Sequence, residues 1–354
     1  MPHAYIFHGP DGVGKEMLAG RLSRLLLCPN RIAVEPPAGV ASVGDSITYH
    51  DACEACEDCT LTAAGTHPDL HRVYRELNKF HPDTTIRNRK AVDLGVDVVR
   101  HFLIDAAATK PVRGQAKVFV IPEAERMSIA AQNALLKTLE EPPPTTYLLL
   151  LVRSMDRLLP TTRSRCQPVP FQLLPVAFVA ERIRAERADV DPPVAEYVAS
   201  LTGGRLGAAF AAIDDGYHEI KTSLGKRLVA LAPGDALALS KSLLDTGKKL
   251  AEKAKERNKN ASDTELTRVG LRALITMTAE FYRDALRRAA GATEGMTNAD
   301  QAALIATLAQ RTGTIGADAA IKHLTQAESN LDRNANVQLA IDALSIGLCR
   351  ANRA

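Results

Sequence analysis

A glycine-rich stretch close to the start of the sequence constrains the fold of this chain most. The short apolar run from Ala4 to Phe7 predicts a buried strand, which breaks into a loop from Gly9 to Gly14. A helix is expected next, because apolar residues recur with helical spacing at Leu18, Leu22, Leu25 and Leu26. A strand, a glycine loop and a helix in this order form the frame in which many proteins bind phosphate groups.

The spacing inside the loop fits a phosphate-binding loop up to one position. Gly9, four further residues, Gly14 and Lys15 match the pattern G-x-x-x-x-G-K, in which backbone N–H groups and a lysine surround phosphate oxygens. The next position should be Ser or Thr, because that hydroxyl holds the magnesium that bridges the phosphates. Glu16 stands there instead. The candidate nucleotide-binding residues are Gly9, Gly12, Gly14 and Lys15.

A second magnesium contact is expected where the strand from Lys117 to Ile121 ends, since hydrolysing enzymes of this kind carry Asp there. Pro122 occupies that position, and a proline side chain has no atom that coordinates a metal; Glu123 follows it. With both contacts missing, we expect neither bound Mg²⁺ nor ATP hydrolysis by this chain. Two alternatives stay open: the loop is only a packed turn, or it binds nucleotide without hydrolysing it.

Composition narrows the classes of protein to which the chain belongs. Its 354 residues are enough for two or three domains, each with its own core. The net charge of +3 is too small to argue for nucleic-acid binding by itself. No apolar run reaches the roughly 18 residues of a membrane span and no signal peptide is recognised, so we expect a cytoplasmic protein. In that compartment the six cysteines are more often thiols or metal ligands than disulfides.

Three of the cysteines are spaced for metal binding. Cys53, Cys56 and Cys59 are separated by two residues each, a spacing that can direct three thiolates at one ion. A closed tetrahedral zinc site needs a fourth ligand, for which Cys28 is the best candidate. We expect a structural zinc ion, because no general base nearby suggests metal-activated water; three surface thiols without metal are the alternative, and a redox pair is less favoured. His67 and His71 are the alternative ligands, whereas Cys166 and Cys349 lie in other sequence contexts.

Strands and helices alternate over about 170 residues, which predicts an α/β domain with a parallel sheet and helices on both faces. Helices are expected from Asp97 to Ala108 and from Glu123 to Glu141, the second stopped by three prolines. Loops are expected from Leu77 to Arg89 and in an insert after Cys28. The insert contains Pro36, Pro37, Gly39 and Gly44. Further strands are predicted in the residues that end at Val73 and at Lys117–Ile121, Tyr147–Val152 and Val169–Leu173.

After Leu174 the predicted strands stop and the rest of the chain is expected to be helical. A small helical unit with a Gly203-Gly204 turn precedes a longer helical region, whose last helix is amphipathic. We therefore predict three domains, spanning residues 1–172, 173–224 and 225–354. The apolar face of the last helix consists of Val337, Ala340, Ile341, Leu344 and Leu348.

One charged stretch, from Lys248 to Asn260, contains six basic residues. Contact with DNA phosphates is one interpretation, but Glu252 and Glu256 are interleaved, which favours an ordinary solvated helix face. The basic residues considered for this contact are Lys248, Lys249, Lys253, Lys255 and Arg257.

Several longer phrases resemble a known family. Ala131-Gln-Asn-Ala-Leu-Leu-Lys-Thr-Leu-Glu-Glu-Pro-Pro143 and Leu158-Leu-Pro-Thr-Thr-Arg-Ser-Arg-Cys166 are similar to motifs of the AAA+ clamp-loader subunits of bacterial DNA polymerase III. The cysteine motif, the following Ala64-Gly-Thr-His-Pro-Asp69 and the late Asn334-Ala-Asn-Val-Gln-Leu-Ala340 extend the resemblance. It is specific over residues 3–170 and weaker afterwards. The departures at Glu16 and Pro122 favour a non-hydrolysing subunit over the ATP-hydrolysing gamma/tau subunit.

The resemblance implies a RecA-like AAA+ domain with a zinc-binding insertion, a small helical lid and a helical collar that joins a five-subunit ring. It implies a subunit that does not turn over ATP and acts as a rigid stator. The arginine of its Ser-Arg-Cys motif, here Arg165, would reach into the neighbouring gamma/tau ATP site. The implied partners are the gamma/tau and delta subunits and, through the complex, the sliding clamp and primer–template DNA. Without the resemblance, Arg165 would be interpreted as an ordinary ion-pairing arginine before a strand.

Three features depart from the family pattern. The family usually has a helix before the motif that contains His3 and Ala4, and its first two motif cysteines are separated by far fewer than the 24 residues between Cys28 and Cys53. The lid position at which an active ATPase carries a sensor arginine is Leu206, with Arg205 one place away. The last departure agrees with a silent nucleotide site.

Two other functions are weighed against the non-hydrolysing subunit. One is an active ATPase like gamma/tau, with Lys15 and Glu123 as its catalytic residues. The other is a phosphate-loop kinase of small metabolites with a zinc-bound lid. A kinase gives no role to the Ser-Arg-Cys phrase, and the missing magnesium ligands argue against the ATPase.

Overall fold

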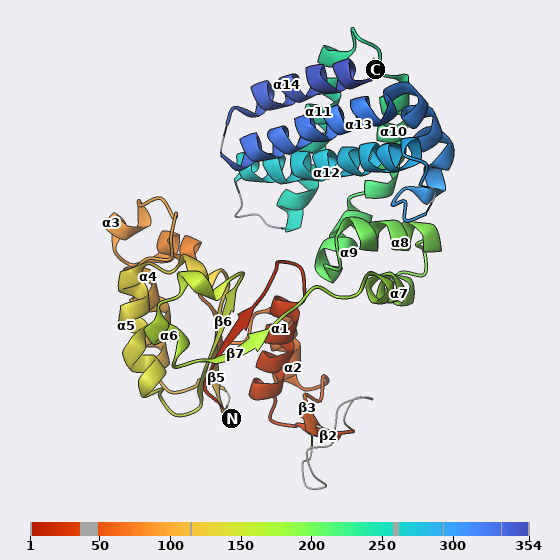
Figure 1. Cartoon of the computed structure of the whole chain (residues 1–354). Coiled ribbons are helices and arrows are strands. Elements are labelled where there is room, and N and C mark those ends of the chain that lie inside the picture. Colours follow the sequence, from red (N-terminus) through yellow and green to blue (C-terminus); the bar gives the residue numbers. More distant parts are fainter. Residues whose placement is uncertain are drawn as a thin grey trace. The chain divides into compact units, whose positions relative to one another are not determined.

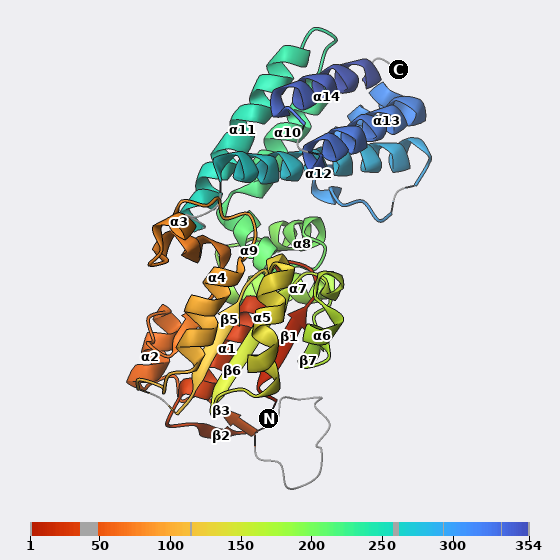
Figure 2. The same ribbon diagram turned by 90° about the vertical axis from the view of Figure 1, so that its left-hand side faces the viewer.

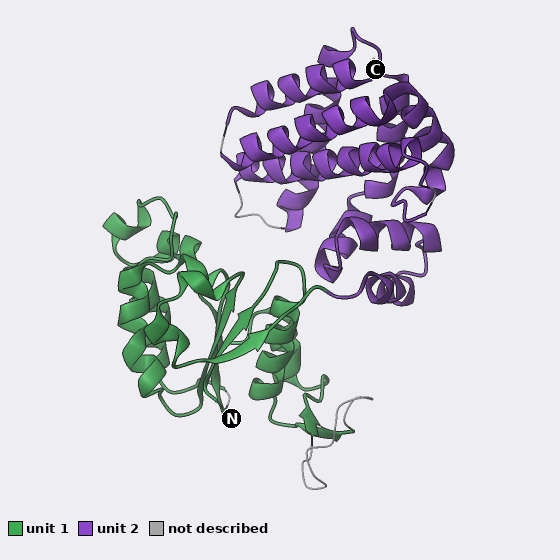
Figure 3. Ribbon diagram, viewed as in Figure 1, with its two compact units in different colours: residues 1–173 green, residues 174–354 purple. Residues whose placement is uncertain are grey.

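The computed structural model describes residues 2–35, 49–113, 115–257, 262–292, 294–333 and 335–352. The predicted loop with Pro36, Pro37, Gly39 and Gly44 lies outside these residues, as do Asn334 and the end of the basic stretch at Asn260. The chain forms two compact units, residues 1–173 and 174–354 (Figure 3). Within the described residues, no helix is both long and apolar enough to span a membrane.

The first unit is built on a parallel sheet of five strands in the order β4-β5-β6-β1-β7. The first strand of the chain lies between two later ones, with Ile6 opposite Leu150 of β6 and Pro168 of β7. Parallel neighbours need long crossover connections, which the helices provide. The strands are β1 (Ala4–His8), β4 (Leu70–Arg72), β5 (Lys117–Ile121), β6 (Thr146–Val152) and β7 (Gln167–Pro170).

Helices cover both faces of this sheet because its central strands are apolar on both sides. On one face, Leu149 and Leu151 pack with α1 (Lys15–Leu27). On the other, Leu148 and Leu150 pack with α4 (Val96–Val99), η2 (Arg100–Asp105) and α5 (Ile129–Glu140). Figures 1 and 2 show α1 and α5 on opposite sides of the strands. The prediction of a parallel α/β domain is confirmed.

The remaining elements of the first unit are short. A two-stranded antiparallel sheet, β2 (Ile32–Val34) and β3 (Tyr49–Asp51), precedes α2 (Glu57–Ala64). Between β4 and α4 lie η1 (Arg75–Phe80) and α3 (Thr84–Arg87), so the prediction of a loop from Leu77 to Arg89 was wrong. The amide of Asn78 donates to the Arg89 carbonyl at 2.6 Å, which ties this polar segment together without apolar periodicity. The other short helices are η3 (Ala124–Arg126), η4 (Met155–Arg157) and α6 (Pro160–Arg163).

Three predicted elements are displaced in the structure. The helix expected from Glu123 begins only at Ile129, because Glu123 has a left-handed backbone with φ +49° and Ser128 forms the N-cap. The last strand is Gln167–Pro170 rather than Val169–Leu173. The buried face of α1 is also different, since Leu18 is exposed. Ala19, Ser23, Leu26 and Leu27 are the apolar and small residues buried there.

The second unit is entirely helical in its described residues. Two separate apolar clusters fill it, one within α7 to α9 and one within α10 to α14. The prediction of helices throughout is confirmed, whereas the division into lid and collar at residue 225 stays a prediction. Its elements are α7 (Val176–Glu186), α8 (Pro192–Leu201), α9 (Leu206–Asp214), α10 (Tyr217–Ala230), α11 (Ala236–Arg257), α12 (Asp263–Ala289), η5 (Ala299–Gln301), α13 (Ala302–Asp332) and α14 (Val337–Ala351).

Candidate functional site

The glycine loop lies at the carboxyl end of β1, beside the ends of its two neighbours, β6 and β7. This edge is where parallel α/β sheets bind ligands. Gly9 is required there, because its φ is +150° and a Cβ would lie 2.1 Å from the Phe171 carbonyl oxygen. Gly14 is the N-cap of α1 with φ +98°. The predicted loop geometry is therefore present.

Lys15 closes the loop on itself. Its side chain is almost fully buried, and Nζ donates to the carbonyl oxygens of Gly9 at 2.5 Å and Pro10 at 2.6 Å. Burial lowers the pKa of Lys15, and nearby Asp11 opposes that shift. The ammonium group thus donates hydrogen bonds to carbonyl oxygens of the loop itself. A phosphate group would compete with these contacts for the same donor.

The positions that should hold magnesium are engaged in other contacts. Glu16 pairs with Arg72 of β4, with 3.2 Å between Oε2 and Nη2. Pro122 follows β5 directly, and the carboxylate of Glu123 lies 3.3 Å from Nε of Arg126. The side chain at the first expected metal position is thus paired with an arginine, and the second position is a proline that offers no metal ligand.

Sequence reasoning missed two charged residues around this loop. Arg153 follows β6 and pairs with Asp11 of the loop. Glu125 in η3 has a buried Oε2 with no hydrogen-bond partner among the described residues, and its charge acts on Lys15. The signal for Arg153 was available, because a residue that directly follows a strand paired with β1 must lie near the loop.

The four predicted metal ligands come together in one cluster. The Sγ atoms of Cys28, Cys53, Cys56 and Cys59 all lie within 4.8 Å of one another. The Sγ–Sγ distance is 3.6 Å between Cys28 and Cys53, and 3.9 Å from Cys28 to Cys56 and from Cys53 to Cys59. Four sulfurs at about 2.3 Å from one zinc in a tetrahedron would be about 3.8 Å apart. The spacing therefore fits one four-coordinate metal ion.

Local structure explains how distant cysteines meet. Cys28 is the C-cap of α1, and Cys56 is the N-cap of α2, whose first turn contains Cys59. Backbone N–H groups of Cys53, Cys56 and Cys59 each point at a sulfur of the cluster, at 3.4 Å. N–H donors at sulfur stabilise thiolates, the form that binds metal.

The electrostatics of the cluster are compatible with a bound cation. Backbone N–H groups of Ala55 and Cys56 lower the pKa of the Cys53 thiol to about 6, whereas burial raises that of Cys59 to about 12. A buried thiol of that kind becomes a ligand only when a metal ion compensates its charge. The cluster is thus compatible with a bound metal, and an all-thiolate set selects soft ions such as zinc.

The alternative ligands lie elsewhere. His67 has both ring nitrogens occupied, by Asp58 at 3.2 Å and by the N–H of Asp69 at 3.0 Å. His71 stacks on Phe119 with 4.7 Å between the ring centroids. Cys166 and Cys349 are buried in the apolar clusters of the first and second units.

Arg165 lies between α6 and β7, with about a third of its side chain exposed. Its Nε donates to Oε1 of Glu140 at 2.7 Å, and its Nη2 donates to the same oxygen. Its Nη1 donates to the Thr161 carbonyl at 2.9 Å. The guanidinium group is therefore fixed in orientation but partly open to solvent.

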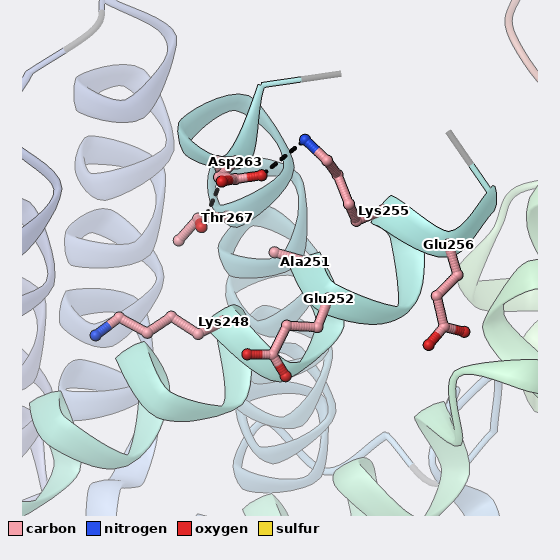
Figure 4. Close-up of a pocket in the computed structure, with 7 residues that line it drawn as sticks. All are labelled: Lys248, Ala251, Glu252, Lys255, Glu256, Asp263 and Thr267. Carbon is pink, nitrogen blue, oxygen red and sulfur yellow. Dashed lines mark hydrogen bonds and ion pairs between the residues drawn. The ribbon is translucent and has the colours of Figure 1, made fainter. Parts of the chain in front are cut away.

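Two of the basic residues of α11, Lys255 and Arg257, pair with acids. Arg257 donates to both carboxylate oxygens of Asp215 at 2.7 Å, and Lys253 donates to the Asp215 carbonyl at 2.9 Å. Lys255 pairs with Asp263 across a shallow cleft between α11 and α12 (Figure 4). The cleft is lined by both signs of charge, which argues against a phosphate-binding groove. Its residues are Lys248, Ala251, Glu252, Lys255, Glu256, Asp263 and Thr267.

Comparison with known proteins places the chain. A family model described as "DNA polymerase III, delta subunit" matches residues 1–175, and one described as "DNA polymerase III, delta subunit, C terminal" matches residues 265–344. A DNA polymerase III subunit delta' of Escherichia coli is 33% identical over 248 residues, which cover 68% of this chain and 64% of that protein. The chain belongs to the delta-prime family of DNA polymerase III subunits.

Other relatives fit this family. The delta' subunit of Pseudomonas aeruginosa is 35% identical over 206 residues, covering 57% of this chain and 53% of that protein. The gamma/tau subunit of Mycobacterium tuberculosis is 32% identical over 216 residues, covering 60% of this chain and 32% of that protein. The chain thus spans between half and two thirds of the length of the delta' subunits of Pseudomonas aeruginosa and Escherichia coli.

Proposed function

We propose that this chain is the delta-prime subunit of a DNA polymerase III clamp loader, a complex that loads the sliding clamp onto primed DNA. Relatives from Pseudomonas aeruginosa and Escherichia coli carry the name delta', and models of the DNA polymerase III delta-subunit family match residues 1–175 and 265–344. Its partners would be the gamma/tau and delta subunits and, through the complex, the clamp and primer–template DNA. This role belongs in the cytoplasm and needs no membrane.

The position of Arg165 carries the proposal. A subunit that donates an arginine to a neighbour's ATP site needs a guanidinium group that is oriented, partly exposed and separate from its own phosphate loop. Arg165 meets the first two conditions through Glu140 and Thr161, and it precedes the edge strand β7 rather than the loop after β1. A cation placed beside a transferring phosphoryl group accelerates the reaction by about 10³–10⁵-fold.

The absence of ATP turnover by the chain itself is the second part of the proposal. Lys15 is bonded to the loop's own carbonyls, Glu16 pairs with Arg72, and Pro122 stands where an Asp would bind the metal. The chain would then contribute to the catalysis of its neighbour and have none of its own.

We further propose that the four cysteines hold a structural zinc ion. Cys28, Cys53, Cys56 and Cys59 supply all four ligands of a tetrahedral site, which leaves no position for a water molecule. The ion would stabilise the α1–α2 region and take no part in chemistry. Iron also binds in tetrahedral sites made of four thiolates, so the metal must be identified by analysis.

The experiment that tests the proposal measures ATP hydrolysis by a complex reconstituted from gamma/tau, delta and this chain, stimulated by clamp and primed DNA. Replacement of Arg165 by Ala should lower kcat by at least 10-fold, because one neighbouring ATP site loses its cation. The chain alone should show no turnover. An unchanged rate in the Arg165→Ala complex would overturn the arginine assignment.

An active ATPase like gamma/tau is the second candidate, favoured by the G-x-x-x-x-G-K loop and by the Mycobacterium tuberculosis gamma/tau relative. It requires Mg²⁺-dependent hydrolysis by the isolated chain and its loss on replacement of Lys15. The same assay therefore separates the two candidates.

A further inference from the structure

Arg165 and Glu140 are 25 residues apart in sequence but share a contact that the proposed function does not use. Glu140 is the last residue of α5, and Arg165 follows α6. Two nitrogens of the guanidinium group, Nε and Nη2, converge on the single oxygen Oε1 of Glu140. Among the described contacts of Arg165, this is the one that comes from outside its own loop.

The contact is built on a fixed support. α5 begins at the Ser128 N-cap, and its buried residues Ala131, Leu135 and Leu139 pack against the sheet. Glu140 therefore extends from a helix whose position is set by the core. On the other side of the guanidinium group, the Thr161 carbonyl accepts from Nη1 at 2.9 Å.

The hydrogen bonds that hold the Arg165 guanidinium group leave at least one of its N–H donors free. An arginine has five N–H donors in a rigid planar fork. Glu140 takes one from Nε and one from Nη2, and Thr161 takes one from Nη1. The Ser164 hydroxyl lies 3.4 Å from Nη1 and takes at most a weak fourth. At least one N–H, on Nη2, remains for a phosphate oxygen of a neighbouring subunit.

The strength of the Arg165–Glu140 contact decides whether Glu140 keeps Arg165 from a neighbouring phosphoryl group or orients it towards that group. Both side chains are partly exposed, 32% for Arg165 and 49% for Glu140. Exposed ion pairs shift an equilibrium by at most about five-fold. A transferring phosphoryl group gains about 10³–10⁵-fold from an arginine. Glu140 is too weak to retain Arg165 against that gain, but it can select one rotamer of a long and otherwise mobile side chain.

We propose that Glu140 is the positioning residue for Arg165: it fixes the guanidinium group by its Nε and Nη2 edge, so that the free N–H is oriented before the neighbouring ATP site closes on it. This inference rests on the proposed function of Arg165. The side chain acts only through Arg165 and touches no substrate.

The test uses the reconstituted complex with Glu140→Ala, Glu140→Gln and Glu141→Ala, each in the presence and absence of Arg165→Ala. Glu140→Ala should lower kcat for ATP on the order of 3- to 10-fold with KM within about two-fold, because orientation in the transition state is lost while ATP binding is not. Glu140→Gln should recover part of kcat, since its amide oxygen still accepts from Nε. Glu141, the exposed C-cap residue of α5, is the matched control and should leave kcat unchanged.

The Arg165→Ala background separates a positioning role from a merely structural one. Glu140→Ala should have no further effect there, because its partner is gone, whereas a damaged fold or ring would lower the rate again. An unchanged or raised kcat for Glu140→Ala alone would overturn the inference and leave the function of Arg165 intact. An Arg165→Ala complex with full activity would instead overturn the proposed function, and the role of Glu140 with it.

Discussion

The guanidinium group of Arg153 lies against the carboxylate of Asp11, with 2.7 Å between Nε and Oδ2. This ion pair joins the end of β6 to the glycine loop. Nζ of Lys15 lies 3.9 Å from the other oxygen of the same carboxylate. Asp11 therefore connects the loop's lysine with an arginine from the neighbouring strand, and no bound anion is needed to hold the two cations near each other.

The Arg153–Asp11 pair should contribute little to stability despite its short distance. Both side chains are more than half exposed, 59% and 57%. Arg153→Ala should lower the free energy of unfolding by less than about 1 kcal/mol. Urea denaturation of both single variants and the double variant gives the coupling energy, which should fall further at high salt. A coupling above about 2 kcal/mol would show that the pair is a structural clamp rather than a surface contact.

Lys15→Met should leave the ATPase rate of the assembled complex within about two-fold of wild type. The reason is that Nζ already serves the carbonyls of Gly9 and Pro10, so no transferring phosphate depends on it. Arg165→Ala in the same preparation is the positive control for loss of rate. A ten-fold decrease for Lys15→Met would mean that ATP is hydrolysed in this chain's own loop.

Metal analysis should find one ion per chain, and Cys56→Ser should abolish it. Because the ion offsets the charge of buried thiolates, its removal by a chelator should lower Tm by at least about 5 °C. Cys166→Ser is the control, since that thiol lies in a different apolar cluster and its replacement should keep the metal. A full metal content in Cys56→Ser would show that the ion lies elsewhere.

His71 should make the first unit less stable in acid. Its pKa is lowered from the ordinary value, chiefly by burial and then by the charge of Lys117. Its Nε2 is buried and has no partner in the part of the chain that the structure describes. Below about pH 6.5 the unfolded chain takes up a proton on this imidazole before the folded chain does. The free energy of unfolding therefore falls as the pH drops through 6.5 towards the lower folded pKa.

The measurement compares urea unfolding of wild type and His71→Phe between pH 7.5 and 5.5. Phe keeps the ring that stacks on Phe119 and cannot take up the proton. The variant should lose less stability than wild type over this range, so the difference between the two narrows or reverses in acid. Equal slopes for the two proteins would contradict the assignment to His71.

The sequence predicted elements best where one physical signal dominated. The run from Lys117 to Ile121 is a strand with those bounds. Its residues are all buried, and a short, mostly apolar run of β-branched and aromatic residues favours a buried strand. The helix expected from Glu123 begins six residues later, at Ile129. The sequence predicted the earlier start because residues 123–128 contain no Gly or Pro that would break a helix. The left-handed backbone of Glu123 prevents a helix there, and the Ser128 side chain, a common N-cap, accepts from the Ala131 N–H and sets the start.

The site residues divide in the same way. The cysteines were predictable because their spacing and thiol chemistry together indicate a metal site. Cys28 belongs to this site although 24 residues separate it from Cys53, because the end of α1 places it beside the other three. Glu140 was not predictable as a partner of Arg165. Its position depends on how α5 and α6 pack side by side, and no local pattern encodes that contact between distant residues.

Helix α1 begins at Lys15 and is followed directly by Cys28, so the phosphate loop and the metal cluster lie at opposite ends of one 13-residue helix. An ion bound at one end would fasten the helix whose other end shapes the loop. Since the loop is also closed by its own lysine, its form would stay the same whether ATP, ADP or neither is abundant in the cell. In the proposed clamp-loader role, the chain is the fixed reference against which nucleotide-driven neighbours would move.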